Sequence, residues 1–334
     1  MAGFDIFLFY GISSLVISSF TIVGNGLILF AFFQERSLRD NPSNNFIIAL
    51  SLNDLFYGVI NFIFIGIPYT FIDGYPYGEI GCMMYASLNH IFVVGNLLLL
   101  AISVDRVLLV AIKYPRYPKF QTSSRVGIAI AMCCITGLLL AIGELSLWNY
   151  AKKVDHIAAV LNYKQYCLSP PRRLREFGLV LSFGFYLFPI SAIFILNGLF
   201  FSFLIRKIKG HFKVGNSSIQ SEVDAMRRNQ MQAASNHEED GSSSTKNRYI
   251  KPAITLGVLV GAMAISNIPY CTYIIVVAFC ETCKNPTMVG IYALNSQLNA
   301  LLDPLFYALT QRKIGNFYRK KARRFWDWAR DLFR

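Results

Sequence analysis

Residues 298–309 read LNALLDPLFYAL, an apolar run that also carries Asn299, Asp303, Pro304 and Tyr307. In a membrane helix this combination is costly, because an ionisable residue at the bilayer centre costs about 2.5–3.5 kcal/mol. The proline adds to the cost, since it removes one backbone hydrogen bond and kinks the helix. We therefore expect a structural or functional reason for Asp303 and Pro304.

Seven long apolar runs, of which this is the last, dominate the chain of 334 residues. Hydrophobic residues make up 54% of the sequence and charged residues 15%, whereas soluble proteins usually have about 25% charged residues. Since a span needs about 20 apolar residues, we predict an all-α membrane protein, a seven-transmembrane helix bundle. The predicted spans are residues 6–33, 43–70, 82–112, 126–149, 177–205, 252–279 and 287–310.

Positive charge is unevenly distributed over the loops between these runs. The net charge is +13, but most of the 32 Lys and Arg residues fall on the side that holds the C-terminus. This one-sided pattern is typical of a membrane protein and does not point to nucleic acid as a partner. Because basic loops stay in the cytoplasm, we expect a multi-pass protein of the plasma membrane with an extracellular N-terminus and a cytoplasmic C-terminus.

Two segments differ from the apolar runs. Residues 206–250 are polar, and we expect this loop to be largely disordered. Residues 311–334 place aromatic residues at helical spacing between Lys and Arg. They predict a short amphipathic cytoplasmic eighth helix that contacts membrane lipid; the alternative is a solvated tail. The predicted domains are therefore the transmembrane domain, 1–310, and this helix with a short tail, 311–334.

Four of the seven cysteines fall in or beside segments that face outward in this topology, where disulfides persist. They allow three pairings. Cys280 and Cys283 are close enough in sequence to close a small loop, which leaves Cys82 for Cys167. The second bond would tie the long outer loop, residues 150–176, to the third span.

Short motifs mark the apolar runs in a fixed order. They are GNGLILF (24–30), NNFIIALSLNDLF (44–56), SVDRVLLV (103–110), RYPKFQT (116–122), Pro189, Pro269 and NSQLNALLDPLFY (295–307). Each is weak by itself, but in this order across seven spans they resemble the rhodopsin-like (class A) G-protein-coupled receptors over nearly the whole chain.

The resemblance implies an activation switch at the cytoplasmic end. Asp105 is expected to hold Arg106 at rest, because an unpaired arginine there is costly, and Arg106 then swings free to meet the G protein. The alternative is that Arg106 is only a basic anchor. Family members often add an acid on the sixth span, where this chain has Tyr249. The implied switch residues are Asp105, Arg106, Pro269, Asp303, Pro304 and Tyr307.

The resemblance also implies a cation site in the middle of the bundle. Asp54 and Asp303 would both point inward, where two carboxylates must share a proton, shift their pKa values upward or bind a cation. The candidate sodium ligands are Asp54, Asn299 and Asp303; no other cofactor is expected. The family usually has a serine where this chain has Gly95. The alternative is a purely structural polar cluster.

The ligand pocket departs from the best-known receptor classes. Amine receptors have an aspartate where this chain has Asn89, counting from Cys82, or Leu88, counting back from Arg106. Opsins have a lysine where this chain has Gln297. The candidate ligand-binding residues implied by family position are Asn89, Phe92, Ser182, Asn267, Tyr270, Ile274, Tyr292 and Gln297.

Several further residues bear on how a ligand would bind and act. Asn267 and Asn197 replace a tryptophan and a tyrosine that serve the family as switches. Glu144, near the outer end of the fourth span, is a candidate anchor for a cationic ligand. The basic outer loop SPPRRLRE, residues 169–176, instead favours an anionic ligand or lipid headgroups. His90 is interpreted as a satisfied interior histidine.

Together these features predict a receptor that converts binding of an extracellular ligand, a small molecule, into activation of a heterotrimeric G protein. They do not predict an enzyme, since the sequence shows no nucleophile with its base, no zinc spacing and no phosphate loop. Two alternatives are a transporter or channel, which should show inverted repeats, and a light sensor, which Gln297 disfavours.

Overall fold

The structure is a computed structural model of the chain. It describes residues 6–72, 75–112, 116–154, 167, 169–203, 205–206, 267–269, 272–273, 275–276, 279–280, 286–310 and 312–332. Tyr249, Tyr270, Ile274, Cys283 and the loop 207–250 lie outside the described residues, as does the side chain of Tyr292.

Each regular element within those ranges is helical. The α-helices are α1 (Ile6–Gln34), α2 (Asn44–Asn61), α3 (Ile67–Phe71), α4 (Gly78–Leu88), α5 (Ile91–Ala111), α6 (Arg116–Phe120), α7 (Ser123–Val154), α9 (Arg175–Leu179), α12 (Pro286–Thr310) and α13 (Arg312–Leu332). Short 3₁₀ turns occupy Arg36–Leu38 and Pro171–Arg173, and π-helical stretches occupy Phe62–Gly66 and Val180–Leu187.

Five of the helical segments are long and apolar enough to cross a membrane. They are Phe7–Gln34, Asn44–Phe71, Gly78–Ala111, Ser123–Val154 and Arg175–Phe203. These segments match the first five predicted spans. Helix α12 coincides with the seventh predicted span, residues 287–310. Most of the sixth predicted span, 252–279, lies outside the described residues.

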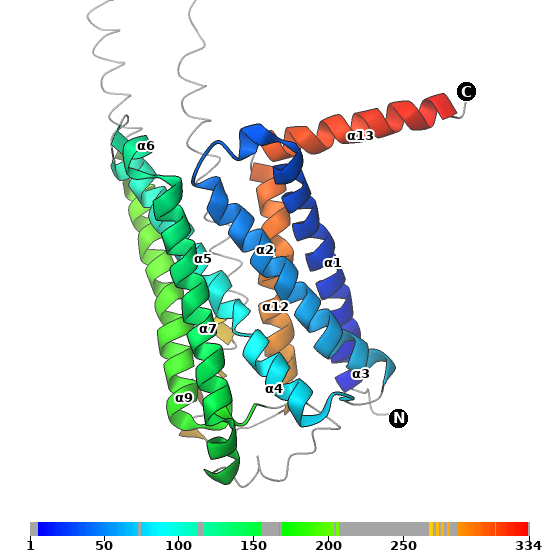
Figure 1. Ribbon diagram of the computed structural model, residues 1–334, viewed down its shortest axis with the longest axis vertical. Helices are drawn as coiled ribbons and strands as arrows, with labels where there is room; N and C mark the ends of the chain where they lie inside the picture. The colour runs from blue at the N-terminus through cyan, green and yellow to red at the C-terminus, as the bar shows by residue number, and fades with distance from the viewer. Residues whose placement is uncertain are drawn as a thin grey trace, which may run out of the picture.

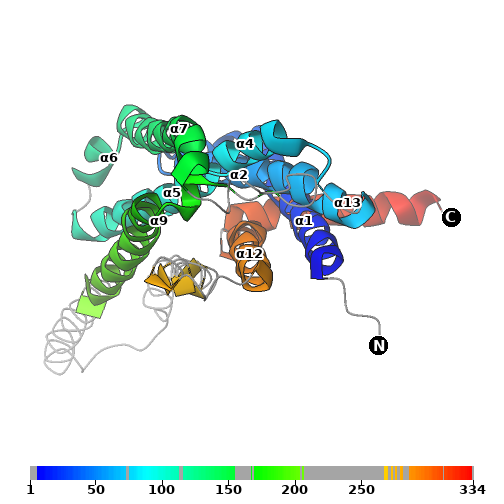
Figure 2. The same ribbon diagram turned by 90° about the horizontal axis from the view of Figure 1, so that it is seen from below.

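The spans run side by side along one axis (Figure 1). Helix α1 packs along both α2 and α12, while α5 packs against α2 and α7. Figure 2, which looks along the bundle, shows α12 beside α1 and α7 beside α4 and α5. The N-terminus lies at one end of the bundle, and α13 extends outward from the other end (Figure 1).

The bundle has an apolar core, but it also exposes large apolar side chains on its outer surface. Large apolar side chains on α7, such as Leu138, Leu139 and Ile142, are exposed. The same helix buries Gly137 and Glu144. Exposed apolar surface on a span suits lipid, which cannot hydrogen-bond, so polar groups lie where other helices can satisfy them.

The third span is interrupted between α4 and α5. The backbone N–H of His90 bonds to the carbonyl of Ser87 (3.2 Å), and that of Val93 bonds to the carbonyl of His90 (3.0 Å). Both bonds join residues three apart, as in a 3₁₀ turn, which uses fewer residues per turn than an α-helix. The tightened turn explains why counts from Cys82 and from Arg106 differ by one residue at the ligand position.

Helix α13 is anchored to the first span at the end of the bundle away from the N-terminus. Ile314 is fully buried, and the ring of Phe317 lies against that of Phe30 (6.3 Å between centroids). The hydroxyl of Tyr318 donates a hydrogen bond to the carbonyl of Leu27. The helix then projects sideways, away from the bundle (Figure 1).

Candidate functional site

A small cavity lies between the helices, near the turn in the third span. It measures about 30 Å³, which is room for about two water molecules. Three of the predicted ligand-binding residues, Asn89, Phe92 and Gln297, line it. The remaining lining residues, which sequence reasoning did not select, are Tyr57, Asn61, Tyr85, Tyr186, Ala293 and Ser296.

Other predicted ligand-binding residues are placed differently. Ser182 and Asn267 are completely buried but do not line the cavity. Sequence reasoning missed the contribution of the second span because it counted family positions on other spans. The signal available was Asn61, an amide inside an apolar run, which needs a polar partner in the membrane.

Neutral hydrogen bonds organise one wall of the cavity. The amide oxygen of Gln297 accepts from the hydroxyl of Ser14 (3.1 Å), and its Nε2 donates to Oδ1 of Asn61 (3.3 Å). The hydroxyl of Tyr85 donates to the same Asn61 oxygen (3.2 Å). The side chain of Gln297 thereby joins the first, second and seventh spans, and Tyr85 adds the third.

Aromatic rings form the other wall. The ring centroids of Tyr57 and Phe92 are 5.5 Å apart, and those of Phe92 and Tyr186 are 5.7 Å apart. Oδ1 of Asn89 is buried and accepts no hydrogen bond. The described lining therefore offers aromatic faces, amides and hydroxyls, but no charged side chain.

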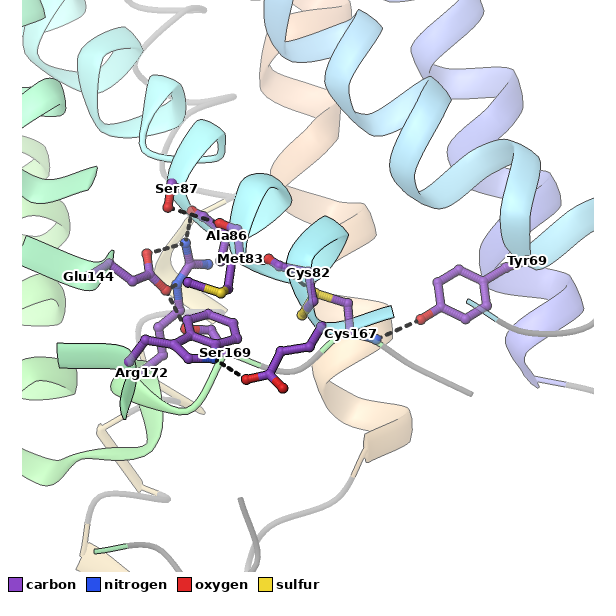
Figure 3. The surroundings of a disulfide bond; sticks show 11 residues. Tyr69, Cys82, Met83, Ala86, Ser87, Glu144, Cys167, Ser169 and Arg172 are labelled. Atoms are coloured by element: carbon purple, nitrogen blue, oxygen red, sulfur yellow. Dashed lines mark hydrogen bonds and ion pairs between the residues drawn. A yellow bond between two sulfur atoms is a disulfide. The ribbon is translucent and has the colours of Figure 1, made fainter. Parts of the chain in front are cut away.

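The outer loop is tied to the bundle beside this cavity. The predicted disulfide between Cys82 and Cys167 is present, and the backbone N–H of Cys167 donates to the hydroxyl of Tyr69 (3.2 Å) (Figure 3). Cys280 is disulfide-bonded, but Cys283 lies outside the described residues, so its pairing stays a prediction.

Glu144 does not offer the free carboxylate that a cationic ligand would need. Both of its oxygens are engaged by Arg172 of the outer loop (2.9 and 3.1 Å) (Figure 3). The acid and the basic loop, interpreted from the sequence as separate candidate contacts for ligands, instead satisfy each other. The physical reason is that a buried carboxylate is stable only when it is paired.

Two residues of the first span, Asn25 and Gly24, accommodate Pro304. A proline at residue 304 has no N–H to donate to the carbonyl of Ala300, one helical turn earlier. Nδ2 of Asn25 donates to that carbonyl instead (3.0 Å). Gly24 leaves room for the proline ring, since a Cβ there would lie 2.8 Å from Cγ of Pro304.

The predicted polar cluster forms in the middle of the bundle. The carboxyl groups of Asp54 and Asp303 are both buried, and their charges interact. Where the family usually has a serine, a Cβ on Gly95 would lie 2.9 Å from Nδ2 of Asn53. That amide donates to Oδ1 of Asp54 (3.3 Å), so it occupies the space of the missing hydroxyl.

At the inner end, the structure shows partners for Asp105 other than the predicted Arg106. Oδ1 of Asp105 accepts hydrogen bonds from Ser43 (3.2 Å), Tyr117 (2.7 Å) and Gln121 (2.5 Å), and Asp105 forms no ion pair with Arg106. The physical reason is that these three donors already satisfy the buried carboxylate, so they compete with Arg106 for it. Burial raises the pKa of Tyr117, so its phenol stays protonated and can donate.

Because Asp105 has other partners, Arg106 is not held in an ion pair with it. Its side chain is partly exposed. The Tyr307 hydroxyl is buried without a hydrogen-bond partner. Pro269, Asp303, Pro304 and Tyr307 stay predicted switch residues, because a single conformation does not test their movement.

Comparison with known proteins agrees with this architecture. The profile of the 7 transmembrane receptor (rhodopsin family) matches residues 24–307. The adenosine receptor A2a of Cavia porcellus is 23% identical over 330 residues, which is 96% of this chain and 74% of that receptor. The octopamine receptor beta-1R of Drosophila melanogaster is 26% identical over 325 residues, which is 92% of this chain and 60% of that receptor.

A third relative, melanopsin of Podarcis siculus, is 27% identical over 302 residues, which is 88% of this chain and 58% of that protein. This chain therefore spans less than two thirds of the length of two of these three relatives. The family consists of non-enzymatic, multi-pass membrane receptors. Because the profile covers most of the chain, from the first span to the seventh, the chain belongs to the rhodopsin family of seven-transmembrane, G-protein-coupled receptors.

Proposed function

We propose that this receptor converts the binding of a small, uncharged extracellular molecule into activation of a heterotrimeric G protein. The observation that carries the proposal is the cavity beside the third-span turn, whose described lining has no charged side chain. An uncharged ligand would lie beside the rings of Tyr57, Phe92 and Tyr186, and the cavity would have to widen to receive it, since its present volume holds about two water molecules. A donor group on it would satisfy Oδ1 of Asn89, which is buried without a partner.

The relatives support a small ligand and help to narrow its class. Two of them are named for adenosine and octopamine, which are small molecules. A protonated amine would find no carboxylate in the described lining, so the cavity suits an uncharged molecule better. A light-sensing role is disfavoured because the neutral amide of Gln297 stands where an opsin needs a lysine.

The proposed orientation is an extracellular N-terminus and a cytoplasmic C-terminus in the plasma membrane. The end of the bundle that holds the N-terminus also holds the Cys82–Cys167 disulfide, and disulfides persist on the oxidising side. The opposite end holds Arg106 and α13. There the exposed basic residues of α13, such as Arg319 and Lys320, would contact anionic lipid headgroups.

The central cluster of Asp54 and Asp303 is the proposed sodium site. Oδ2 of Asp54, both carboxylate oxygens of Asp303 and Oδ1 of Asn299 are buried without hydrogen-bond partners. Oxygen atoms of this kind are the ligands that hard cations prefer, so the described residues fit the ion. A bound cation would also offset the repulsion between two buried carboxylates.

The sodium site can be tested without a ligand. In purified receptor, replacing N-methylglucamine chloride with sodium chloride at equal ionic strength should raise the Tm, because a ligand that binds only the folded state stabilises it. Asp54→Asn should abolish this increase, and Glu79→Gln, which changes a carboxylate outside the cluster, should preserve it. A sodium response that survives in Asp54→Asn would exclude this site.

Receptor function is tested by expression in cells that report each G-protein family in turn. A library containing uncharged, amine and carboxylate compounds should yield an uncharged agonist, and Arg106→Ala should abolish its signal at equal surface expression. If the receptor-expressing cells instead transport a library compound across the membrane and no G-protein reporter responds, the transporter or channel alternative is favoured.

A further inference from the structure

The third and fourth spans and the outer loop meet at one completely buried acid, Glu144. Nε and Nη2 of Arg172 donate to its two oxygens at 2.9 and 3.1 Å, and the hydroxyl of Ser169 donates to Oε1. Nε2 of His90 lies 2.6 Å from Oε2. Glu144 thus contacts Arg172 and Ser169 of the outer loop (Figure 3) and also His90 of the third-span turn.

Arg172 also supplies a hydrogen bond that the backbone of the third span lacks. Because the N–H of His90 bonds to Ser87, the carbonyl of Ala86 loses the donor that a regular α-helix would supply. Nη2 of Arg172 donates to that carbonyl at 2.7 Å. The same guanidinium therefore caps the interrupted helix and binds the buried carboxylate.

The fourth span is shaped to reach this turn. A Cβ on Gly137 would lie 2.4 Å from Cγ2 of Val94 and 3.5 Å from the carbonyl oxygen of His90, so only a glycine lets the helices approach this closely. Gly137 and Glu144 are two turns apart on the same buried face of α7. The close approach places Glu144 beside His90.

The turn held in this way belongs to the wall of the cavity. Asn89 and Phe92, which line the cavity, flank His90 in the sequence. Arg172 contacts Ala86 and Glu144 contacts His90. Asn89 lies between Ala86 and His90 in the sequence. A movement of the turn would therefore change the position of the Asn89 amide relative to the opposite wall.

We propose that Glu144, Arg172 and His90 form a clamp that holds the 3₁₀ turn of the third span and so positions Asn89 in the ligand cavity. The clamp rests on the proposed function, in which this cavity receives the ligand. Arg172 and Glu144 are positioning residues, because they act on the cavity through the backbone at Ala86 and the side chain of His90. The described residues of the outer loop thereby set the shape of the cavity without contributing to its lining.

The experiment measures access to the cavity and needs no agonist. Asn89→Cys is introduced, and its rate of labelling by a biotinylated methanethiosulfonate is measured in intact cells, with the unmodified receptor as background. Adding Glu144→Gln should raise the rate about tenfold, since losing a charge-assisted hydrogen bond changes an opening equilibrium by at least this factor. Arg172→Gln, at a side chain only partly buried, should give the same increase if Glu144→Gln reaches the surface poorly.

Two matched controls separate the clamp from general loosening. Glu79→Gln breaks the neighbouring link from the third to the fourth span, where the carboxylate of Glu79 binds Lys152 (2.6 Å) and Trp148 (3.0 Å); it should leave Asn89→Cys labelling unchanged. Ser296→Cys, on the α12 side of the cavity, should label at the same rate with and without Glu144→Gln.

The clamp is supported only if labelling rises at residue 89 alone and only with the clamp variants. Unchanged labelling at residue 89, or an equal rise at residue 296 or with Glu79→Gln, overturns it. None of these outcomes depends on G-protein signalling, so failure of the clamp and failure of the proposed receptor function are distinguishable.

Discussion

At the scale of single residues, Asn25 explains how a proline is accommodated in the seventh span. Its amide supplies the hydrogen bond that Pro304 cannot give to the carbonyl of Ala300. An unpaired backbone carbonyl in the bundle would cost about 1–3 kcal/mol. Asn25 in the first span thus compensates for the N–H that Pro304 lacks in the seventh span.

Asn25→Ala should therefore destabilise the purified receptor by about 1–3 kcal/mol. Pro304→Ala restores a backbone N–H at residue 304, so Asn25→Ala should cost less in that background. Thermal unfolding of the four proteins of this double-mutant cycle measures the coupling. Equal losses in both backgrounds would show that Asn25 does not act through the carbonyl of Ala300.

Tyr117 is a second residue whose contribution can be tested by a single substitution, here through its effect on ligand-free signalling. It donates one of the three hydrogen bonds to Asp105. In Tyr117→Phe the carboxylate of Asp105 loses a donor and becomes freer to attract Arg106, which should favour the resting state. A change of about 1 kcal/mol would lower the ligand-free signal roughly fivefold.

Ligand-free signalling in the G-protein reporters, normalised to surface expression, tests this prediction. Tyr150→Phe, at an exposed tyrosine on α7, is the control and should have no effect. A wild-type receptor that is silent without ligand, or a Tyr117→Phe signal equal to that of the wild type, would contradict the proposed competition for Asp105.

At the scale of elements, glycines on α7 distinguish a packed face from a lipid-facing one. The missing Cβ of Gly137 faces Val94 on α5, whereas a Cβ on Gly143 would meet nothing within 4 Å. Valine is stiff about its first side-chain torsion, so Val94 cannot easily turn away. Two similar glycines on one helix therefore have opposite roles.

Gly137→Ala should lower the stability of the purified receptor by about 1–3 kcal/mol, because overpacking forces the third and fourth spans apart. Gly143→Ala should leave stability unchanged or raise it by about 0.5–1 kcal/mol, the helix-propensity difference between the two residues. The Tm of each variant in detergent provides the measurement. Similar changes for both would mean that α7 and α5 do not pack as closely as described.

At the scale of the whole molecule, the two ends of the bundle have distinct chemistry. One end holds the disulfide and the cavity, and the other holds Arg106 and the basic α13. An epitope placed before Met1 should bind antibody on intact cells, while one placed after Arg334 should require permeabilised cells. The opposite staining would overturn the proposed orientation and, with it, the extracellular position of the cavity.

Much of the architecture could be predicted because it follows from local properties of the chain. The length and hydropathy of each run determine whether a segment can cross a bilayer, and the six spans that the structure describes lie where they were expected. The Cys82–Cys167 bond was predictable because few cysteines lie in outward-facing segments. The family resemblance implied that Asp54 and Asp303 point into the interior, and both are buried, where they avoid contact with lipid.

The pairing of polar side chains could not be obtained in this way. Asp105 bonds to Ser43, Tyr117 and Gln121, and Glu144 bonds to Arg172, because folding brings separate segments together at those points. Counts along the third span from Cys82 and from Arg106 disagreed by one residue, since hydropathy does not record the tightened turn at His90.

The sequence by itself determined the membrane class, the positions of the spans and which residues had to be buried, since these depend on the free energy of transferring each segment into lipid. Only the tertiary structure decided which partner each buried polar group has, because hydrogen bonds depend on distances of a few ångströms between helices remote in sequence. The cavity lining and the attachment of the outer loop to the third-span turn are likewise features that only the tertiary structure decided.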